Sequence, residues 1–280
     1  MSSALDKPAF ALTPRSAKPR CRGITSMIDF GPDTFGWTGG EHGIRDLMSV
    51  AADYIDYAKI YALNALLIPA EVLARTTRLY REAGVKPFAG GILFEYAWQR
   101  NQIDDMIAHL AKLGIPGVEL SENYVELTDD ERHRAIDRLQ KGGLQVVYEF
   151  GRKNPHEALS LDHLGSIVTA VAEHGIDHVT IEQCEIDLLA ADAPAALRDL
   201  AKLPWFDNLV IEVDPYRFPG QHVKILDDFG PDVNLANVTP GQILRLEGFR
   251  QGIGRAVNYW LVSGDASRAA GLSRRAAGET

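Results

Sequence analysis

Short apolar runs alternate with longer amphipathic stretches along the chain from Arg22 onward. The runs are roughly four to eight residues long, and the stretches between them carry apolar residues at helical spacing. This alternation is typical of parallel strands joined by crossover helices. We therefore predict eight strands, which end at Asp29, near Ile60, and at Ala89, Ser121, Phe150, Gln183, Val213 and Val238.

Two of the intervening stretches carry clear helix boundary signals. One begins at Pro69 and stops at Gly84, and the other has Thr128 and Glu131 at the spacing of a capping box. Eight such units in about 230 residues have the size and order of a (β/α)8 TIM barrel, whose active sites lie at the carboxyl ends of the strands. We predict this α/β fold, with a doubly wound open sheet as the alternative.

The two ends of the chain differ from the repeating region. Residues 1–18 and 263–280 are small, polar and aperiodic, so we expect a flexible N-terminal segment and a flexible C-terminal tail. Residues 19–262 are expected to form a single barrel domain. The glycine-rich segment around Trp37 has the composition of a lid or a subunit contact, which leaves a homo-oligomer open.

Composition and charge narrow the class of protein. The chain is 46% hydrophobic and 24% charged, as in ordinary globular domains. Lys and Arg number 29 against 38 Asp and Glu, and no basic cluster carries interleaved aromatics, which excludes a nucleic-acid partner. No apolar run reaches the ~18 residues of a membrane span. The spacing of Cys21 and Cys184 fits no metal or redox motif, so we expect a cytoplasmic protein with inert thiols.

Ionisable side chains recur where the predicted strands end. A barrel gathers these positions at one face, and buried carboxylates there must hold a divalent cation or pair with Lys and Arg. Oxygen ligands favour Mg²⁺ or Mn²⁺ over Zn²⁺, although a structural salt bridge is the commoner role for any single acid. The residues are Asp29, Asp56, Lys59, Glu95, Glu119, Glu122, Glu149, Arg152, Lys153, Glu182, Glu185, Glu212 and Asp214.

Two motifs at the strand ends stand out. In "VKPFAGGILFEYAW", Gly90 and Gly91 indicate either positive φ or close approach of a ligand, and we expect a loop that presents Glu95 at the barrel mouth. A tight turn with a rim carboxylate is the alternative. In "YEFGRK", Arg152 and Lys153 follow a strand and suit an anionic substrate, with a surface cation pair as the alternative.

The motifs resemble those of the phosphosulfolactate synthase family over about residues 19–255. The resemblance rests on "PRCRGITSMIDFG", "DYIDYAKI", "GGILFEYAW", "GVELSENYVELTDDERHRAI", "VVYEFGRKNP" and "FGPDVNLANV", which occur in the family's order. It implies a barrel enzyme that adds sulfite to phosphoenolpyruvate in a Mg²⁺-dependent reaction.

The resemblance also implies roles for particular residues. Mg²⁺, or Mn²⁺ in its place, would be the cofactor, and a small anionic molecule the substrate. Lys59, Lys153 and Glu149 are expected to be catalytic, with one of the two lysines as the proton donor. We expect metal ligands at Glu95, Glu119, Glu182 and Glu185, and substrate contacts at Arg152, Asn234 and Asn237. Apart from the resemblance, we expect a further substrate contact at Arg217, a cation that follows the seventh predicted strand.

The chain departs from the family pattern at three places. It lacks a lysine after Asp29, a glycine and hydroxyl run after Ile60, and an arginine after Gln183. Two cations that would help to hold phosphate and sulfite are therefore missing. Two alternatives follow: a metal-dependent barrel enzyme for a less charged carboxylic acid, and a non-catalytic, stress-related family member.

Overall fold

The computed structural model describes residues 10, 12, 14–32 and 40–263. Its eight strands form a closed parallel barrel in chain order, which confirms the predicted TIM barrel and excludes the open sheet. Residues 33–39, the central part of the segment predicted as a lid or subunit contact, lie outside the described residues, as do residues 264–280 of the predicted flexible tail 263–280.

Six of the eight predicted strand ends are confirmed. Strand β6 ends at Ile181 rather than Gln183, because Glu182 is already the N-cap of a helix, and β7 ends one residue early. The strands are β1 Thr25–Asp29, β2 Tyr57–Ile60, β3 Lys86–Ala89, β4 Gly117–Ser121, β5 Gln145–Phe150, β6 Val179–Ile181, β7 Leu209–Glu212 and β8 Leu235–Val238.

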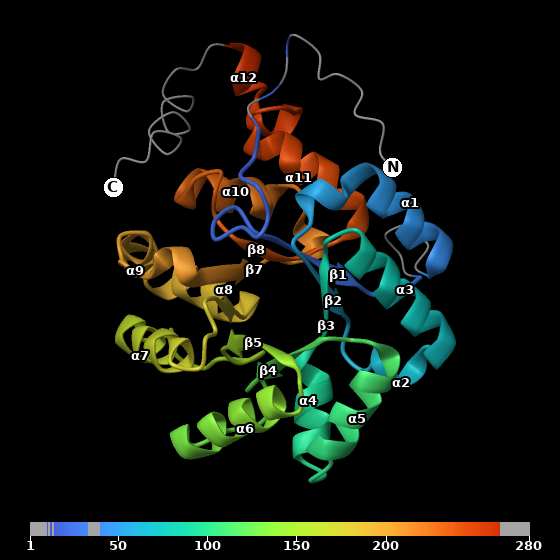
Figure 1. The fold of residues 1–280 in the computed structure, drawn as a ribbon. Helices are drawn as coiled ribbons and strands as arrows, with labels where there is room; N and C mark the ends of the chain where they lie inside the picture. Colours follow the sequence, from blue (N-terminus) through green and yellow to red (C-terminus); the bar gives the residue numbers. More distant parts are fainter. Residues whose placement is uncertain (1–9, 11, 13, 33–39, 264–280) are drawn as a thin grey trace.

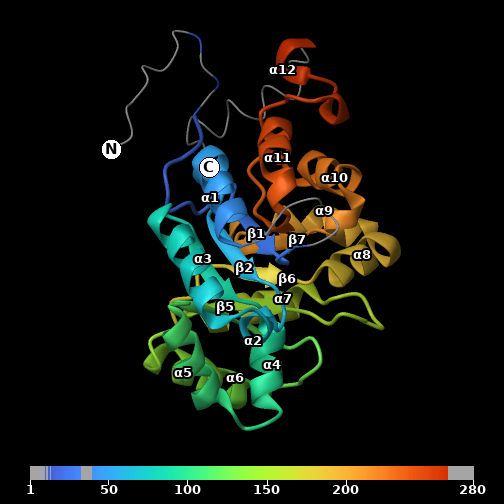
Figure 2. The same ribbon diagram turned by 90° about the vertical axis from the view of Figure 1, so that its right-hand side faces the viewer.

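Helices surround the strands in chain order, as Figure 1 shows. Figure 2 shows α1 and α3 on the opposite side of the barrel from α8 and α10. The helices are α1 Glu41–Ala51, α2 Asn64–Leu67, α3 Ala70–Glu82, α4 Gly91–Trp98, α5 Ile103–Leu113, α6 Asp129–Lys141, α7 Leu161–Ala172, α8 Gln183–Asp192, α9 Pro194–Leu200, α10 Gly220–Phe229, α11 Ile243–Arg250 and α12 Trp260–Ser263, with 3-10 turns η1 Ala52–Tyr54, η2 Phe206–Asn208, η3 Pro215–Arg217, η4 Pro240–Gln242 and η5 Arg255–Val257.

The helix boundary signals act as predicted. Pro69 is the N-cap of α3, and Gly84 follows its end. At α6 the Glu131 N–H donates to Thr128 Oγ1 at 3.3 Å, and the Thr128 N–H donates to the Glu131 carboxylate at 2.9 Å, so both halves of the capping box form. Among the described residues, no helix has the length and apolar character needed to cross a membrane.

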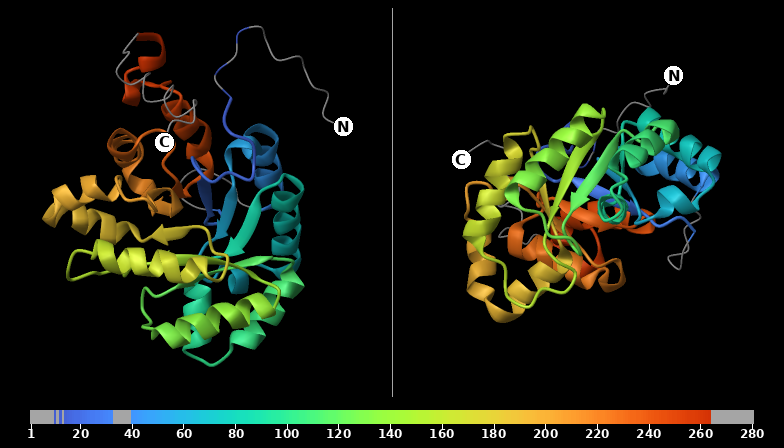
Figure 3. Two further views of the ribbon diagram at one scale, coloured as in Figure 1. Left: turned by 60° about the vertical axis from the view of Figure 1, so that its left-hand side comes forward. Right: turned by 90° about the horizontal axis from the view of Figure 1, so that it is seen from below.

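Part of the N-terminal segment packs against the barrel. Arg15 forms an ion pair with Glu247 of α11 at 3.0 Å, and Lys18 Nζ donates to the Ala52 carbonyl at 2.7 Å. The two contacts are made with α11 and η1, which belong to the layer of helices around the strands. Figure 3 shows this layer from two other sides. Lys18 also donates to the carbonyls of Ile55 and Gly84, which precede β2 and β3, so this segment packs at the amino-terminal end of the barrel.

His222 of α10 is a fully buried histidine that has no hydrogen-bond partner within the described ranges of the chain. Neither ring nitrogen is paired, and the ring packs edge-on against Phe218 at 4.8 Å between centroids. Burial, helped by the nearby Arg250 guanidinium, lowers the pKa of His222 to about 4. The native state therefore holds a neutral imidazole that the unfolded chain would protonate below its ordinary pKa.

Acid should consequently weaken the fold through His222. Because the folded pKa is depressed, its stabilising contribution is complete above about pH 6.5 and is lost as pH falls toward 4. Between pH 7.5 and 5 we expect the free energy of unfolding of the unchanged protein to fall by roughly 2 kcal/mol relative to that of His222→Leu, measured with urea. His222→Leu should remove this part of the pH dependence, and an unchanged slope would contradict the assignment.

Candidate active site

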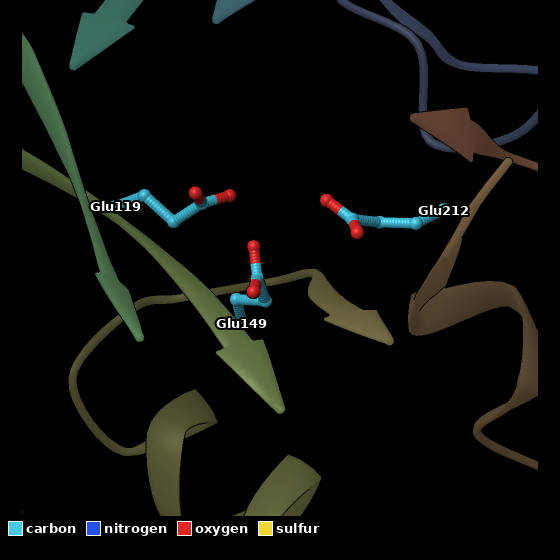
Figure 4. Close-up of side chains that lie close together, drawn as sticks. All are labelled: Glu119, Glu149 and Glu212. Carbon is cyan, nitrogen blue, oxygen red and sulfur yellow. The ribbon is translucent and has the colours of Figure 1, made fainter. Parts of the chain in front are cut away.

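A buried lysine lies at the centre of three carboxylates inside the barrel. Lys59 Nζ of β2 is 2.9 Å from Glu119, 3.0 Å from Glu149 and 2.8 Å from Glu212. Figure 4 shows the three glutamates pointing toward one another from β4, β5 and β7. Each offers an oxygen within 4.8 Å of the others, and all are almost fully buried. We call Glu119, Glu149 and Glu212 the carboxylate trio.

Lys153, from the segment after β5, is a second cation beside the trio. Its ammonium contacts Glu182, which directly follows β6, and lies 3.8 Å from both Glu149 and Glu212. The trio and Glu182 thus contribute four formal negative charges against two from the lysines. The cluster has two surplus negative charges, which a divalent cation or two protons would balance.

Burial and mutual repulsion shift the pKa values of this cluster in different directions. Burial and Glu149 raise the pKa of Glu119 to about 8, and burial with Glu212 raises the pKa of Glu182 to about 8. Although burial opposes it, the Lys59 and Lys153 charges lower the pKa of Glu149 to about 2. The acids likewise raise the pKa of both lysines despite burial, which keeps them protonated.

Glu95 supports the site from α4 rather than from a loop. The predicted loop is wrong, because the strand leads directly into α4. The Glu95 carboxylate accepts hydrogen bonds from Ser121 Oγ and from the backbone N–H groups of Asn123 at 3.0 Å and Tyr124 at 2.8 Å. Asn123 Nδ2 in turn donates to Glu149 at 2.7 Å. Glu95 therefore fixes the loop after β4 that orients Glu149.

The two glycines at the start of α4, the N-cap Gly90 and the first helical residue Gly91, are explained by close approach of other parts of the protein. Neither has positive φ. A Cβ on Gly91 would lie 2.2 Å from Ser121 Oγ, and one on Gly90 would lie 3.1 Å from the Ile60 carbonyl. The Gly91 N–H also donates to Glu119 at 2.9 Å. Because the two glycines have no side chains, α4 can begin close to β2 and β4. Its first backbone N–H, that of Gly91, then donates to Glu119 of the trio.

A cavity of about 160 Å³ opens beside the cluster. Its wall includes Lys59, Glu119, Glu149, Lys153 and Asn237. Asn237 of β8 has φ 61°, and its Oδ1 is buried without a hydrogen-bond partner among the described residues. The site thus combines fixed acids, two cations and one unsatisfied acceptor on a single small cavity.

The remaining predicted site residues lie outside this cavity. Glu185 and Arg152 line a larger neighbouring cavity of about 790 Å³, where Glu185 accepts from the Arg152 N–H at 2.9 Å. Arg217 pairs with Asp187 at 2.8 Å and with Asp214.

Asn234 lies at the start of β8, remote from the trio. Its Oδ1 accepts from the Ile24 N–H at 2.9 Å, and its Nδ2 donates to the carbonyls of Asp207 and Leu209, both at 2.9 Å. Its amide is therefore fully used in joining strands at the amino-terminal end of the barrel.

Two members of the site were not among the predicted site residues. Glu212 was recognised only as one strand-end acid, and its signal was its place at the end of β7. Asn123 carried no signal, since a single polar residue in a loop is ordinary. Other strand-end acids have the structural role given as the alternative: Asp56 pairs with Arg20 at 2.8 Å, and Glu122 with Arg132 at 2.7 Å.

The fold and this cluster define a (β/α)8-barrel enzyme with a lysine-centred carboxylate site at the carboxyl ends of its strands. Residues 13–255 match the model of the (2R)-phospho-3-sulfolactate synthase family, ComA. The chain belongs to this family.

Curated relatives agree with this assignment, and a solved structure is similar in fold alone. The phosphosulfolactate synthase of Methanocaldococcus jannaschii is 30% identical over 241 residues, covering 83% of this chain and 92% of the relative. That of Methanothermobacter thermautotrophicus is 30% identical over 250 residues, covering 87% and 94%. The N-acetylneuraminate lyase of Fusobacterium nucleatum is similar in fold, with a TM-score of 0.52, 13% identity and coverage of 91% and 80%.

Gly91→Ala should disturb both the fold and the site. Its methyl group would collide with Ser121, so we expect a loss of about 1–3 kcal/mol in the free energy of unfolding. Gly220→Ala is the matched control, because it also opens a helix but a Cβ there meets nothing within 4 Å. Urea unfolding of both variants checks this; equal stabilities would show that α4 tolerates the added atom.

Proposed function

We propose that this protein adds an anionic sulfur nucleophile, sulfite in the family's reaction, to phosphoenolpyruvate or a related enol acid. Family membership and the names of the relatives support the reaction type. The observation that carries the proposal is the set of buried acids and two lysines on one cavity. Such a set can bind a cation and supply protons within one small space.

The carboxylate trio fits a divalent ion in its donor chemistry. Three carboxylate oxygens within 4.8 Å of one another are the hard ligands that Mg²⁺ and Mn²⁺ prefer, and the two surplus negative charges match a divalent cation. We assign the ion to Glu119, Glu149 and Glu212. Bound there, it would stabilise negative charge that develops on the substrate's carboxylate. Glu182 adds a fourth acid nearby, whereas Glu95 and Glu185 have backbone partners.

Proton transfer is the part that the lysines perform. In the addition, a bond forms between sulfur and the methylene carbon, the double-bond electrons move toward the carboxylate, and the neighbouring carbon then takes a proton. We assign this proton to Lys153, whose side chain lines the cavity and is 32% exposed, against 9% for Lys59. Its acidic neighbours keep it protonated until the carbanion forms.

The reaction and the role of Lys153 are tested together. Incubation of the protein with phosphoenolpyruvate, sulfite and Mg²⁺ should give the sulfonated adduct in mass spectra. Lys153→Met should lower kcat on the order of 10²- to 10⁴-fold. Lys202→Met is the control, because Lys202 is an exposed lysine that pairs with Asp199 on the surface. The kcat of this variant should equal that of the unchanged protein. No adduct with the unchanged protein would refute the proposed reaction.

A second candidate is a metal-dependent reaction on a less charged carboxylic acid. The observation that favours it is that the described cations around the mouth are already paired: Arg152 with Glu126, Arg217 with Asp187, and Lys153 with Glu182. A phosphorylated substrate needs cations that these acids already hold. The substrate of this second reaction would still be a small anion, since a carboxylic acid is ionised at neutral pH.

A thermal-shift series separates the two candidates. Phosphoenolpyruvate with Mg²⁺ should raise the Tm more than unphosphorylated carboxylic acids do if the first candidate holds, because tighter ligands stabilise the native state more. The reverse order would favour the second candidate.

Both candidates suit a cytoplasmic protein, monomeric or homo-oligomeric, whose cysteines are unpaired.

A further inference from the structure

We propose that Lys59 is the built-in occupant of the cation position in the carboxylate trio, and that it moves into the adjoining cavity when a divalent ion binds there. The inference rests on the proposed metal-dependent function and deepens it. When the ion binds, the Lys59 ammonium group would leave the trio and contact the wall of the adjoining cavity, where the substrate is proposed to bind.

The first reason is that the two cations compete for the same oxygens. Lys59 Nζ contacts all three carboxylates at 2.8 to 3.0 Å. A magnesium ion binds oxygens at ~2.0–2.1 Å and accepts few irregular ligands. An ion that shares this set of oxygens would occupy the space of the ammonium group and repel it. Lys59 therefore has to leave at least part of the trio for the ion to enter.

The second reason is charge. Once all four acids are ionised, the trio and Glu182 carry four negative charges, and Lys59 and Lys153 carry two positive ones. A divalent ion added to this set makes the sum neutral only if Lys59 stays within the site. A short displacement inside the site is therefore favoured over expulsion to solvent, because charges buried together are stabilised by mutual compensation.

The third reason is that the chain leaves room and a partner for the displaced group. The cavity of about 160 Å³ borders Lys59 directly. A Cβ at Gly90 would stand 3.5 Å from Lys59 Cε, so the glycine keeps this side of the lysine stem open. The same cavity includes Asn237, whose buried Oδ1 has no hydrogen-bond partner in the described part of the chain and can accept a hydrogen bond from an ammonium group.

A metal titration of two matched variants tests the displacement. Lys59→Met and Lys153→Met each remove one positive charge from the cluster, but only the first vacates the centre of the trio. By calorimetry, we expect Mn²⁺ to bind Lys59→Met at least tenfold more tightly than Lys153→Met. Equal or weaker binding to Lys59→Met would overturn the inference while leaving a metal-dependent enzyme intact. If neither the unchanged protein nor a variant binds Mn²⁺, the metal assignment and the inference both fail.

Lysine reactivity in the unchanged protein gives an answer even if Lys59→Met does not fold. Reductive methylation followed by peptide mass spectrometry reports the accessibility of each amine. We expect Mg²⁺ to increase methylation of Lys59 at least severalfold, with exposed Lys202 as the internal reference. Methylation of Lys59 that stays equally low at saturating Mg²⁺ would show that the lysine keeps its place, and would overturn the inference.

Discussion

The contact between one ammonium group and three carboxylates is the constraint on which the centre of this barrel depends. Lys59, Glu119, Glu149 and Glu212 come from four strands, and none can be removed from water without the others. Breaking such a buried pair typically costs about 3–5 kcal/mol, since the remaining charge is left uncompensated. The strands β2, β4, β5 and β7 are therefore tied to one another through the site as well as through the sheet.

The surrounding shell shows how the protein keeps these charges in place. Glu95 is fully occupied by the loop after β4, and that loop carries Asn123, which donates to Glu149. Gly91 allows α4 to begin against Ser121 and to aim an N–H at Glu119. A site fixed in this way has little freedom at its carboxylates. The two lysine side chains are the groups that can move, because their long aliphatic stems border an open cavity.

The sequence predicts well the strands that carry this site, but it identifies only some of the residues that meet there. Apolar runs locate the strands, and the closed topology then places Glu119 and Glu149 at one face. Which acids converge depends on strand register and on the side each residue faces, where a shift of one residue reverses the direction of the side chain. Glu185 follows β6 and, instead of the trio, accepts from the Arg152 backbone.

Local pattern also fails where tertiary contacts decide. The residues after Gly91 were expected to bend as a loop, but their apolar side chains are buried in α4, which packs on β4. Asn234 and Asn237 are three residues apart in one motif, yet the first binds backbone at the amino-terminal end of the barrel and the second lines the cavity. No single-sequence signal separates these two asparagines.

A crystal structure of the protein grown with Mn²⁺ and phosphoenolpyruvate would show whether the trio and its cavity together bind a cation and an enol acid. We expect an anomalous peak in contact with Glu119, Glu149 and Glu212, and the carboxylate of the ligand in the cavity beside Lys153 and Asn237. A structure at full Mn²⁺ and ligand saturation with Lys59 still bound to all three acids, and with both ligands elsewhere, would contradict this expectation.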